Sequence, residues 1–411
     1  MIQYGLIGEK LTHSYSPQIH RALGDYDYQL LEIKPDQLAT FFETTPFEGI
    51  NVTIPYKQAA LKYCDELSDS ARTIGSVNTI KRLKDGRLYG DNTDVSGFLY
   101  LLKMGNIQVK NKKVLVLGNG GSRLTVVYAL EKEQAAEVIT VSRRGEVNYD
   151  NVYQHLDAQV IINTTPVGMY PNNGESPISL QSFKGLEGVV DLIYNPEQTA
   201  LLMAAQQLGI PNIGGLPMLV AQAASASELF TGDRVAKTYI ATLVKDIRDK
   251  HLNIVLVGMP GSGKTTIGTS LAQLTGRKLV DTDAEIVKKV GKSIPEIFET
   301  VGEVAFRTYE TDVIKKVGAS SGLVISTGGG AILNPENHAH LRQNAIVIFL
   351  ERHLDQLDRS LRPLSGGSLK KMYDERLPIY KKIADVTVIN NQSPPAVTQK
   401  VREAFYEIIN R

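Results

Sequence analysis

The stretch GMPGSGKT at residues 258–265 constrains the fold of this chain more than any other part of the sequence. It fits the phosphate-binding loop pattern G-x-x-x-x-G-K-[ST], in which backbone N–H groups surround phosphate oxygens. The apolar run 253–257 ahead of it is typical of a buried strand, and residues 266–274 are typical of a helix. A plain glycine-rich turn is the alternative, and the flanking strand and helix argue against it. We therefore predict a nucleotide-binding α/β domain with a parallel sheet.

The loop also predicts how a nucleotide is held. Lys264 would reach the β- and γ-phosphates, and the Thr265 hydroxyl would hold Mg²⁺. The helix N-terminus that follows adds its positive dipole end. A nucleotide with Mg²⁺ is therefore the expected ligand, with nucleotide contacts from Gly261, Ser262, Gly263, Lys264, Thr265 and Thr266.

Residues 1–257 precede this loop, and they are too many for a leader. A length of 411 residues fits two or three domains, and 42% apolar with 22% charged residues is typical of a globular protein. A net charge of +1 gives no electrostatic case for nucleic acid or an anionic membrane. The lone Cys64 excludes a disulfide within the chain. With no signal-peptide pattern at 1–10 and no long apolar run, we expect a cytoplasmic protein.

Short polar motifs stand at the ends of predicted elements in the first 100 residues. Ser14 and Ser16 lie two apart before a predicted helix at 18–23, so their hydroxyls either cap that helix or hold a small carboxylate. Lys57 follows a strand predicted from the alternation of Val52 and Ile54; an exposed lysine is usually a solvated surface charge.

A second glycine turn, GNGG at 118–121, follows the buried strand 113–117. The helix 125–133 and the strand 137–141 complete the strand–turn–helix–strand unit that binds dinucleotides. Where an NAD site places an acidic residue, this chain has Ser142, Arg143 and Arg144. Guanidinium groups suit a 2′-phosphate, so we predict NADP(H) as the cofactor.

Residues 1 to about 245 resemble shikimate dehydrogenase. The resemblance rests on motifs in the order of that family: HSYSP at 13–17, NVTIPYK at 51–57, GSVNT at 75–79, NTD at 92–94, NTTPVGM at 163–169, DLIYNP at 191–196 and GLPMLVAQ at 215–222. The family fold is an α/β substrate domain followed by a Rossmann-type NADP domain.

The resemblance implies the residue roles of this half. Lys57 and Asp94 would form the acid/base pair on the C3 oxygen of the substrate. A ketone reduced by hydride needs such a proton donor for its developing alkoxide. Substrate would also contact Ser14 and Ser16 through its carboxylate, and Thr53, Asn78, Tyr194 and Gln222 elsewhere. NADP would contact Gly118, Gly120, Gly121, Ser142, Arg143, Arg144, Gly215 and Met218.

The glycine turn departs from the family pattern, which has arginine at its seventh position. Here Leu124 holds that position and Arg123 precedes it, so the details of phosphate or adenine contact are open.

Two alternatives to the shikimate reaction are also considered. The first half prefers quinate, which shares the carboxylate and ring hydroxyls, or one half of the chain binds a ligand without turnover.

Residues 253 to 411 resemble shikimate kinase. The motifs are the phosphate loop, DTD at 281–283, GEVAFRTYE at 302–310, GGG at 328–330, RPL at 362–364 and DERLPIY at 374–380. From spacing alone, helix capping by Asp283 is the alternative to ligand binding. The resemblance implies that Asp283 binds ring hydroxyls, and that Asp281 supports Mg²⁺ through water. It also implies substrate contacts from Arg307, Gly329 and Arg376, and an Arg362 that lies across the transferring phosphoryl group.

The two resemblances together predict a bifunctional enzyme of aromatic amino-acid biosynthesis. One half would reduce 3-dehydroshikimate to shikimate with NADPH, and the other would phosphorylate shikimate with MgATP. We expect a substrate domain at 1–100 closed by the helix 218–249, a Rossmann domain at 101–249 and a P-loop domain at 250–411. The expected partners are these small molecules, with no nucleic acid or membrane; the sequence does not fix an oligomeric state.

Overall fold

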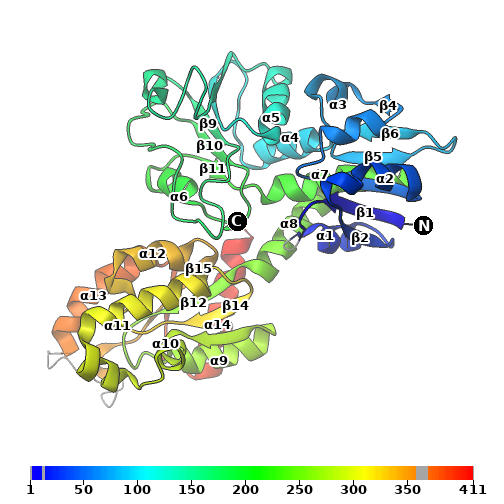
Figure 1. Cartoon of the computed structure of the whole chain (residues 1–411). Coiled ribbons are helices and arrows are strands. Elements are labelled where there is room, and N and C mark those ends of the chain that lie inside the picture. The colour runs from blue at the N-terminus through cyan, green and yellow to red at the C-terminus, as the bar shows by residue number, and fades with distance from the viewer. Residues whose placement is uncertain (1, 12–13, 358–368, 411) are drawn as a thin grey trace. The chain divides into compact units, whose positions relative to one another are not determined.

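A computed structural model gives the architecture of residues 2–11, 14–357 and 369–410 (Figure 1). The chain divides into two compact units. Unit 1 comprises residues 1–169, 175–194 and 201–244, and unit 2 comprises 170–174, 195–200 and 245–411. The described strands form three sheets, two in unit 1 and one in unit 2. The predicted α/β class is confirmed, while the predicted three-domain boundaries stay a prediction.

The first sheet of unit 1 is mixed and has the order β2–β1–β3–β5–β6–β4. Strand β1 pairs in parallel with β2 and β3, and β5 runs antiparallel to β3 and β6. Buried apolar residues such as Ile7, Ile50 and Ile80 form one hydrophobic core of the unit. The strands are β1 Ile2–Gly8, β2 Tyr28–Glu32, β3 Phe47–Val52, β4 Glu66–Leu67, β5 Thr79–Arg82 and β6 Leu88–Asp91. The helices are α1 Ser16–Leu23, α2 Leu38–Thr44, α3 Asp69–Ile74 and α4 Asp94–Met104.

The second sheet of unit 1 is parallel and has the order β11–β10–β9–β7–β8. Its strands are buried on both faces, because α4 and α5 cover one side and α6 covers the other. This explains why its strands are continuous apolar runs. The strands are β7 Lys113–Leu117, β8 Glu137–Val141, β9 Val160–Asn163, β10 Gly188–Asp191 and β11 Asn212–Ile213. The helices are α5 Gly121–Lys132, α6 Ala200–Gln207 and α7 Leu216–Thr231.

Unit 2 contains a parallel sheet with the order β13–β14–β12–β15–β16. Along β12, Val255 and Val257 face one apolar cluster, whereas Ile254 and Leu256 face another. Helices α10 to α13 cover the first face, and α9 and α14 cover the second (Figure 1). The strands are β12 Asn253–Val257, β13 Lys278–Asp281, β14 Leu323–Ser326, β15 Ala345–Glu351 and β16 Val386–Ile389. The helices are α9 Lys264–Thr275, α10 Thr282–Val290, α11 Ile294–Gly318, α12 Pro335–Arg342, α13 Leu369–Ile383 and α14 Pro394–Ile409.

Two element boundaries differ from the sequence prediction. Strand β3 ends at Val52, so Ile54 is not part of it and is 75% exposed. The predicted helix 218–249 is two helices in the structure, α7 and α8, and α8 spans Lys237–His251. Leu252 alone separates α8 from β12.

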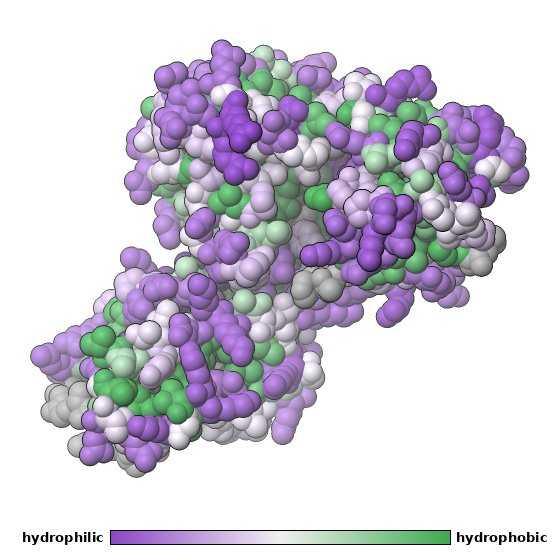
Figure 2. Space-filling model, viewed as in Figure 1, coloured by the Kyte–Doolittle hydropathy of each residue, from purple (hydrophilic) through white to green (hydrophobic). Residues whose placement is uncertain are grey.

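The surface is ordinary for a globular protein. Figure 2 shows hydrophilic residues over much of the visible face of each unit, with hydrophobic residues in between. Among the described residues, no helix combines the length and apolar character that crossing a membrane requires.

Helices α4 and α7 pack closely at Gly97, which generates a stability prediction. A Cβ at this position would lie 2.7 Å from the Met218 carbonyl oxygen and 2.9 Å from Cβ of Gln222. Alanine normally stabilises a helix relative to glycine by about 1 kcal/mol, but here overpacking costs about 1–3 kcal/mol. We expect Gly97→Ala to lower the free energy of unfolding in urea, with faster amide exchange in α4 and α7.

Gly185→Ala is the matched control, because a Cβ there meets no atom within 4 Å. If Gly97→Ala were as stable as Gly185→Ala, the close packing of these two helices would be contradicted.

Candidate active sites

A cavity of about 430 Å³ in unit 1 collects residues that are far apart in the sequence. It lies where β1, β3 and the start of α4 meet α7. Every predicted substrate residue of this half lines it, together with two predicted cofactor residues: Ser14, Ser16, Thr53, Lys57, Asn78, Asp94, Tyr194, Gln222, Gly215 and Met218. The structure therefore brings the predicted dehydrogenase site together, and the individual roles stay predictions.

The predicted acid/base pair is in contact. Lys57 Nζ lies 2.5 Å from Oδ2 of Asp94, with the two side chains 24% and 13% exposed. Lys57 follows β3, and Asp94 is the first residue of α4, so the ends of two elements carry the pair. Its partial exposure leaves the ammonium open to the cavity. The geometry suits proton transfer to a ligand there.

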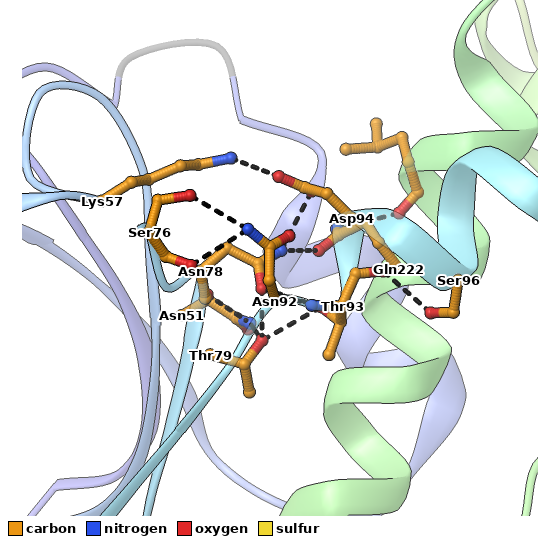
Figure 3. A network of polar contacts seen from close by, with 11 residues as sticks. Asn51, Lys57, Ser76, Asn78, Thr79, Asn92, Thr93, Asp94, Ser96 and Gln222 are labelled. Atoms are coloured by element: carbon orange, nitrogen blue, oxygen red, sulfur yellow. Dashed lines mark hydrogen bonds and ion pairs between the residues drawn. The ribbon is translucent and has the colours of Figure 1, made fainter. Parts of the chain in front are cut away.

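Buried amides fix the Asp94 carboxylate, as Figure 3 shows. Asn78 Nδ2 donates to Asp94 Oδ1 at 2.9 Å, and Asn78 Oδ1 accepts from the backbone N–H of Thr93 at 2.7 Å. Asn51 Nδ2 in turn donates to the Asn78 carbonyl and to Thr79 Oγ1. Asn51 has no predicted role, and its only signal in the sequence is its place as the penultimate residue of β3.

Further polar groups of this cavity come from α7, from the segment after β10 and from the segment that leads into α1. Gln222 on α7 lies with its Oε1 3.4 Å from Asn78 Nδ2. Burial raises the pKa of the Tyr194 hydroxyl, so it stays protonated at neutral pH. Ser14 Oγ accepts a hydrogen bond from the Ser16 N–H at 3.2 Å while both residues line the cavity. The two serines at the start of α1 therefore also line the cavity.

The glycine turn after β7 fits a dinucleotide. Gly118 has φ +111°, and a Cβ there would lie 2.8 Å from Thr164 Oγ1. At Gly120 and Gly121 a Cβ would meet no atom within 4 Å, so there is open space beside the start of α5, where a helix N-terminus favours an anion such as pyrophosphate.

Two sets of basic residues border this turn. Arg143 and Arg144 follow Ser142 after β8 and are exposed, which leaves both guanidinium groups available for a 2′-phosphate. Arg123 lies in the first turn of α5, and its buried Nε has no hydrogen-bond partner among the described residues.

The phosphate loop of unit 2 has the backbone that its sequence predicts. Gly261 and Gly263 have φ +74° and +88°, values that favour glycine. Lys264 begins α9, and its Nζ donates to the carbonyls of Gly258 and Met259 at 2.9 Å each. Burial lowers the pKa of Lys264 to about 8, although Asp283 and Asp281 act in the opposite direction. A buried ammonium aimed into a glycine loop fits a phosphate ligand.

The predicted metal residues touch each other. Thr265 Oγ1 donates to Asp281 Oδ2 at 2.9 Å. Asp281 Oδ1 also caps α10 by accepting from the N–H of Asp283, so the capping residue is Asp281 and not Asp283. No cluster of three metal-binding side chains occurs in the described part of the chain. Mg²⁺ is usually bound by one or two carboxylates together with water and phosphate oxygens, and Asp281 fits that pattern.

The glycine loop at 328–330 collects the predicted substrate residues of unit 2. A Cβ on its first residue would lie 2.4 Å from Asp283 Oδ1, and one on its third residue 2.5 Å from Arg307 Nη1. Arg376 Nη1 donates to the carbonyl of Gly329 at 3.0 Å. Burial raises the pKa of Asp283, and its neighbours Lys264 and Arg307 oppose that shift. One carboxylate and two guanidinium groups thus surround this loop.

Arg307 is held by two carboxylates on its own helix. Its Nη1 lies 2.8 Å from Glu310 and its Nη2 lies 3.1 Å from Glu303. Glu310 belongs to the motif at 302–310 and has no predicted role, yet its side chain is 1% exposed. Arg362, to which the resemblance assigns a catalytic role, lies outside the described residues.

Fold and geometry define a dinucleotide-binding oxidoreductase joined to a P-loop phosphotransferase. Residues 6–80 match the family model of the shikimate dehydrogenase substrate binding domain, and residues 260–410 match that of shikimate kinase. Shikimate dehydrogenase (NADP(+)) of Clostridium beijerinckii is 37% identical over 247 residues, which cover 55% of this chain and 91% of that protein. The chain therefore belongs to the shikimate dehydrogenase family and carries a shikimate kinase domain.

Solved structures agree with this assignment. A chorismate mutase/shikimate 5-dehydrogenase fusion protein from Clostridium acetobutylicum is 36% identical, with a TM-score of 0.57, and covers 61% of this chain and 98% of its own. Quinate dehydrogenase from Corynebacterium glutamicum in complex with NAD is 29% identical, with a TM-score of 0.54, covering 58% of this chain and 96% of its own.

The lowered pKa of Lys264, about 8, generates a prediction for nucleotide binding. The ammonium form binds phosphate and the neutral amine does not, so nucleotide affinity should fall as pH rises through 8. Because phosphate binding favours the charged form, complex formation near pH 8.5 should take up protons. Calorimetric titration with MgADP in buffers of different ionisation enthalpy measures this uptake. An affinity that stays constant between pH 7 and 9.5 would contradict the lowered pKa.

Proposed function

We propose that this chain reduces 3-dehydroshikimate to shikimate with NADPH and phosphorylates shikimate at its 3-hydroxyl with MgATP. The observation that carries the first activity is the single cavity in which Lys57 contacts Asp94 beside the two serines. The family assignment of the first part and the kinase family match of residues 260–410 support both activities.

In the first reaction, bound NADPH supplies the hydride that reduces the ketone carbon at C3. Lys57 Nζ gives a proton to the oxygen that becomes the hydroxyl, and Asp94 holds the ammonium in position. Asn78 keeps the Asp94 carboxylate from turning away. Ser14 and Ser16 bind the ring carboxylate, which orients C3 toward Lys57. The reverse reaction returns the same proton to Lys57.

In the second reaction, the chain mainly positions two anions and neutralises charge. Lys264 and the loop N–H groups bind the phosphates, and Thr265 with Asp281 supports Mg²⁺. Asp283 binds ring hydroxyls, and Arg307 with Arg376 grips the carboxylate, because guanidinium and carboxylate form paired hydrogen bonds. The 3-hydroxyl oxygen then bonds to the γ-phosphorus as the bond from that phosphorus to the β-phosphate oxygen breaks, ADP leaves, and the hydroxyl proton passes to the Asp283 carboxylate. We assign Arg362 to the transferring group from the resemblance alone.

We also propose the finer points that accompany this activity. The three-domain division at 1–100, 101–249 and 250–411 and a cytoplasmic location both suit a biosynthetic enzyme that uses NADPH and ATP. The proposed partners are the small-molecule substrates.

Quinate is the second candidate substrate of the first part. The similarity to quinate dehydrogenase from Corynebacterium glutamicum supports this candidate, and the structure of that enzyme contains NAD. The ratio of kcat/KM for shikimate to that for quinate decides between the two substrates. The arginines at 143 and 144 favour NADP in either case.

The two activities should separate by mutation. Lys57→Ala should lower shikimate oxidation by roughly 100-fold or more, because a general acid–base group contributes about that factor. Lys264→Ala should lower phosphorylation by roughly 100-fold, the scale of one lost charge-stabilising group. Nicotinamide absorbance measures the first reaction, and ADP release coupled to shikimate measures the second.

Each variant is the control for the other, because the unaffected activity reports a folded chain. An unchanged rate of shikimate oxidation in Lys57→Ala would remove the proposed role of that residue.

The cofactor choice gives a further prediction. The double variant Arg143→Ala, Arg144→Ala should raise KM for NADP⁺ by about tenfold or more while leaving KM for NAD⁺ unchanged, since only NADP⁺ carries a 2′-phosphate. Arg87→Ala is the matched control, because this exposed arginine pairs with Asp85 and Glu66 in another part of unit 1. Equal effects on both cofactors would argue against a 2′-phosphate contact.

A further inference from the structure

The hydroxyl of Tyr380 lies between the two glycine loops of unit 2. The side chain comes from α13, is fully buried, and stacks on Phe349 of β15 with ring centroids 5.0 Å apart. Its OH is 2.9 Å from the carbonyl oxygen of Gly258 and 2.6 Å from that of Gly329. Gly258 opens the nucleotide loop, and Gly329 is the centre of the loop predicted to contact substrate. One hydroxyl therefore touches both predicted ligand sites.

Each of these carbonyls already has another donor, and that donor is a cation. Lys264 Nζ donates to the Gly258 carbonyl at 2.9 Å, and Arg376 Nη1 donates to the Gly329 carbonyl at 3.0 Å. These are the groups expected to bind the phosphates and the substrate carboxylate. In the absence of ligands, both carbonyls are satisfied without Tyr380.

Ligand binding changes this balance. When Lys264 turns to a phosphate or Arg376 to a carboxylate, the carbonyl that it leaves is still buried and needs a donor. An unsatisfied buried carbonyl is costly, whereas a shared one is not. The Tyr380 hydroxyl is already within reach of both oxygens, and burial raises its pKa well above the ordinary value, so it remains a donor.

The loops also pack directly against each other. A Cβ on Gly329 would lie 2.6 Å from Cδ of Pro260 in the nucleotide loop. The two loops are therefore in close contact, so a shift of either loop carbonyl would press on the neighbouring loop. That movement would disturb the neighbouring site.

We propose that Tyr380 is a positioning residue of the kinase site: its hydroxyl replaces Lys264 or Arg376 as donor to the loop carbonyls when those cations turn to their ligands. The proposal rests on the kinase activity proposed above. On this proposal, removal of the hydroxyl weakens ligand binding and leaves the stability of the ligand-free protein unchanged. A residue that only stabilised the fold would show the opposite pattern.

Tyr380→Phe in the full chain tests this, with Tyr373→Phe as the matched control. Tyr373 lies on the same helix, and its OH is 3.4 Å from Glu351 Oε1, away from both loop carbonyls. Calorimetric titration with Mg²⁺ and adenylyl imidodiphosphate, and separately with shikimate, measures the two affinities. We expect Tyr380→Phe to weaken each by about tenfold, the effect of one lost buried hydrogen bond. Its ligand-free melting temperature should match that of Tyr373→Phe, which should bind as the unmodified chain does.

The outcomes separate the inference from the proposed function. If the unmodified chain binds nucleotide but does not phosphorylate shikimate, the proposed function fails, and the nucleotide titrations still test Tyr380. If the unmodified chain is active and Tyr380→Phe binds both ligands normally, the inference is wrong. It is equally wrong if Tyr380→Phe melts far below Tyr373→Phe without ligand, because the hydroxyl would then serve the free protein. Shikimate oxidation by the same sample confirms that unit 1 is intact.

Discussion

The Asp94 carboxylate is the group on which the first active site depends. Asp94 as a whole is only 9% exposed. A buried charge is tolerated only when it is paired and hydrogen-bonded. Lys57 supplies the charge and Asn78 supplies the hydrogen bond. Asn78 is itself held by Asn51 and by the backbone of Thr93. The need to satisfy one buried charge thus orders the ends of β3, β5 and β6 and the start of α4.

In unit 2, backbone carbonyl groups are the hydrogen-bond partners of the buried charge. The buried ammonium of Lys264 is satisfied by two carbonyls of its own loop, so no carboxylate has to occupy the place of a phosphate. Asp281 and Asp283 stand nearby and lessen the cost of its charge without contacting it directly. The two sites therefore differ in kind. One keeps a permanent ion pair for proton transfer, and the other keeps a cation ready for an anionic ligand.

Much of this was predictable from the sequence, because glycine turns, apolar strand runs and motif order are local signals. The parallel sheets and the gathering of Lys57, Asp94 and Gln222 in one cavity agree with those signals. What the sequence did not reveal depends on tertiary contact. Asn51, Glu310 and Tyr380 carry no spacing signal of their own, since their partners are backbone or buried groups known only after folding. The end of β3 was placed too late because the alternation of Val52 and Ile54 continues past the last ladder residue.

The glycine loop at 328–330 has a consequence for inhibition. A Cβ on its middle residue, Gly329, would lie 2.6 Å from Cδ and 2.9 Å from the backbone nitrogen of Pro260, so even a methyl group there would require the nucleotide loop to shift. A compound that bound the peptide groups of this loop would be recognised by backbone atoms. Substitution of Gly329 could not remove those atoms and would displace the neighbouring residues. Drug resistance against such a compound would have to arise at other positions of the pocket.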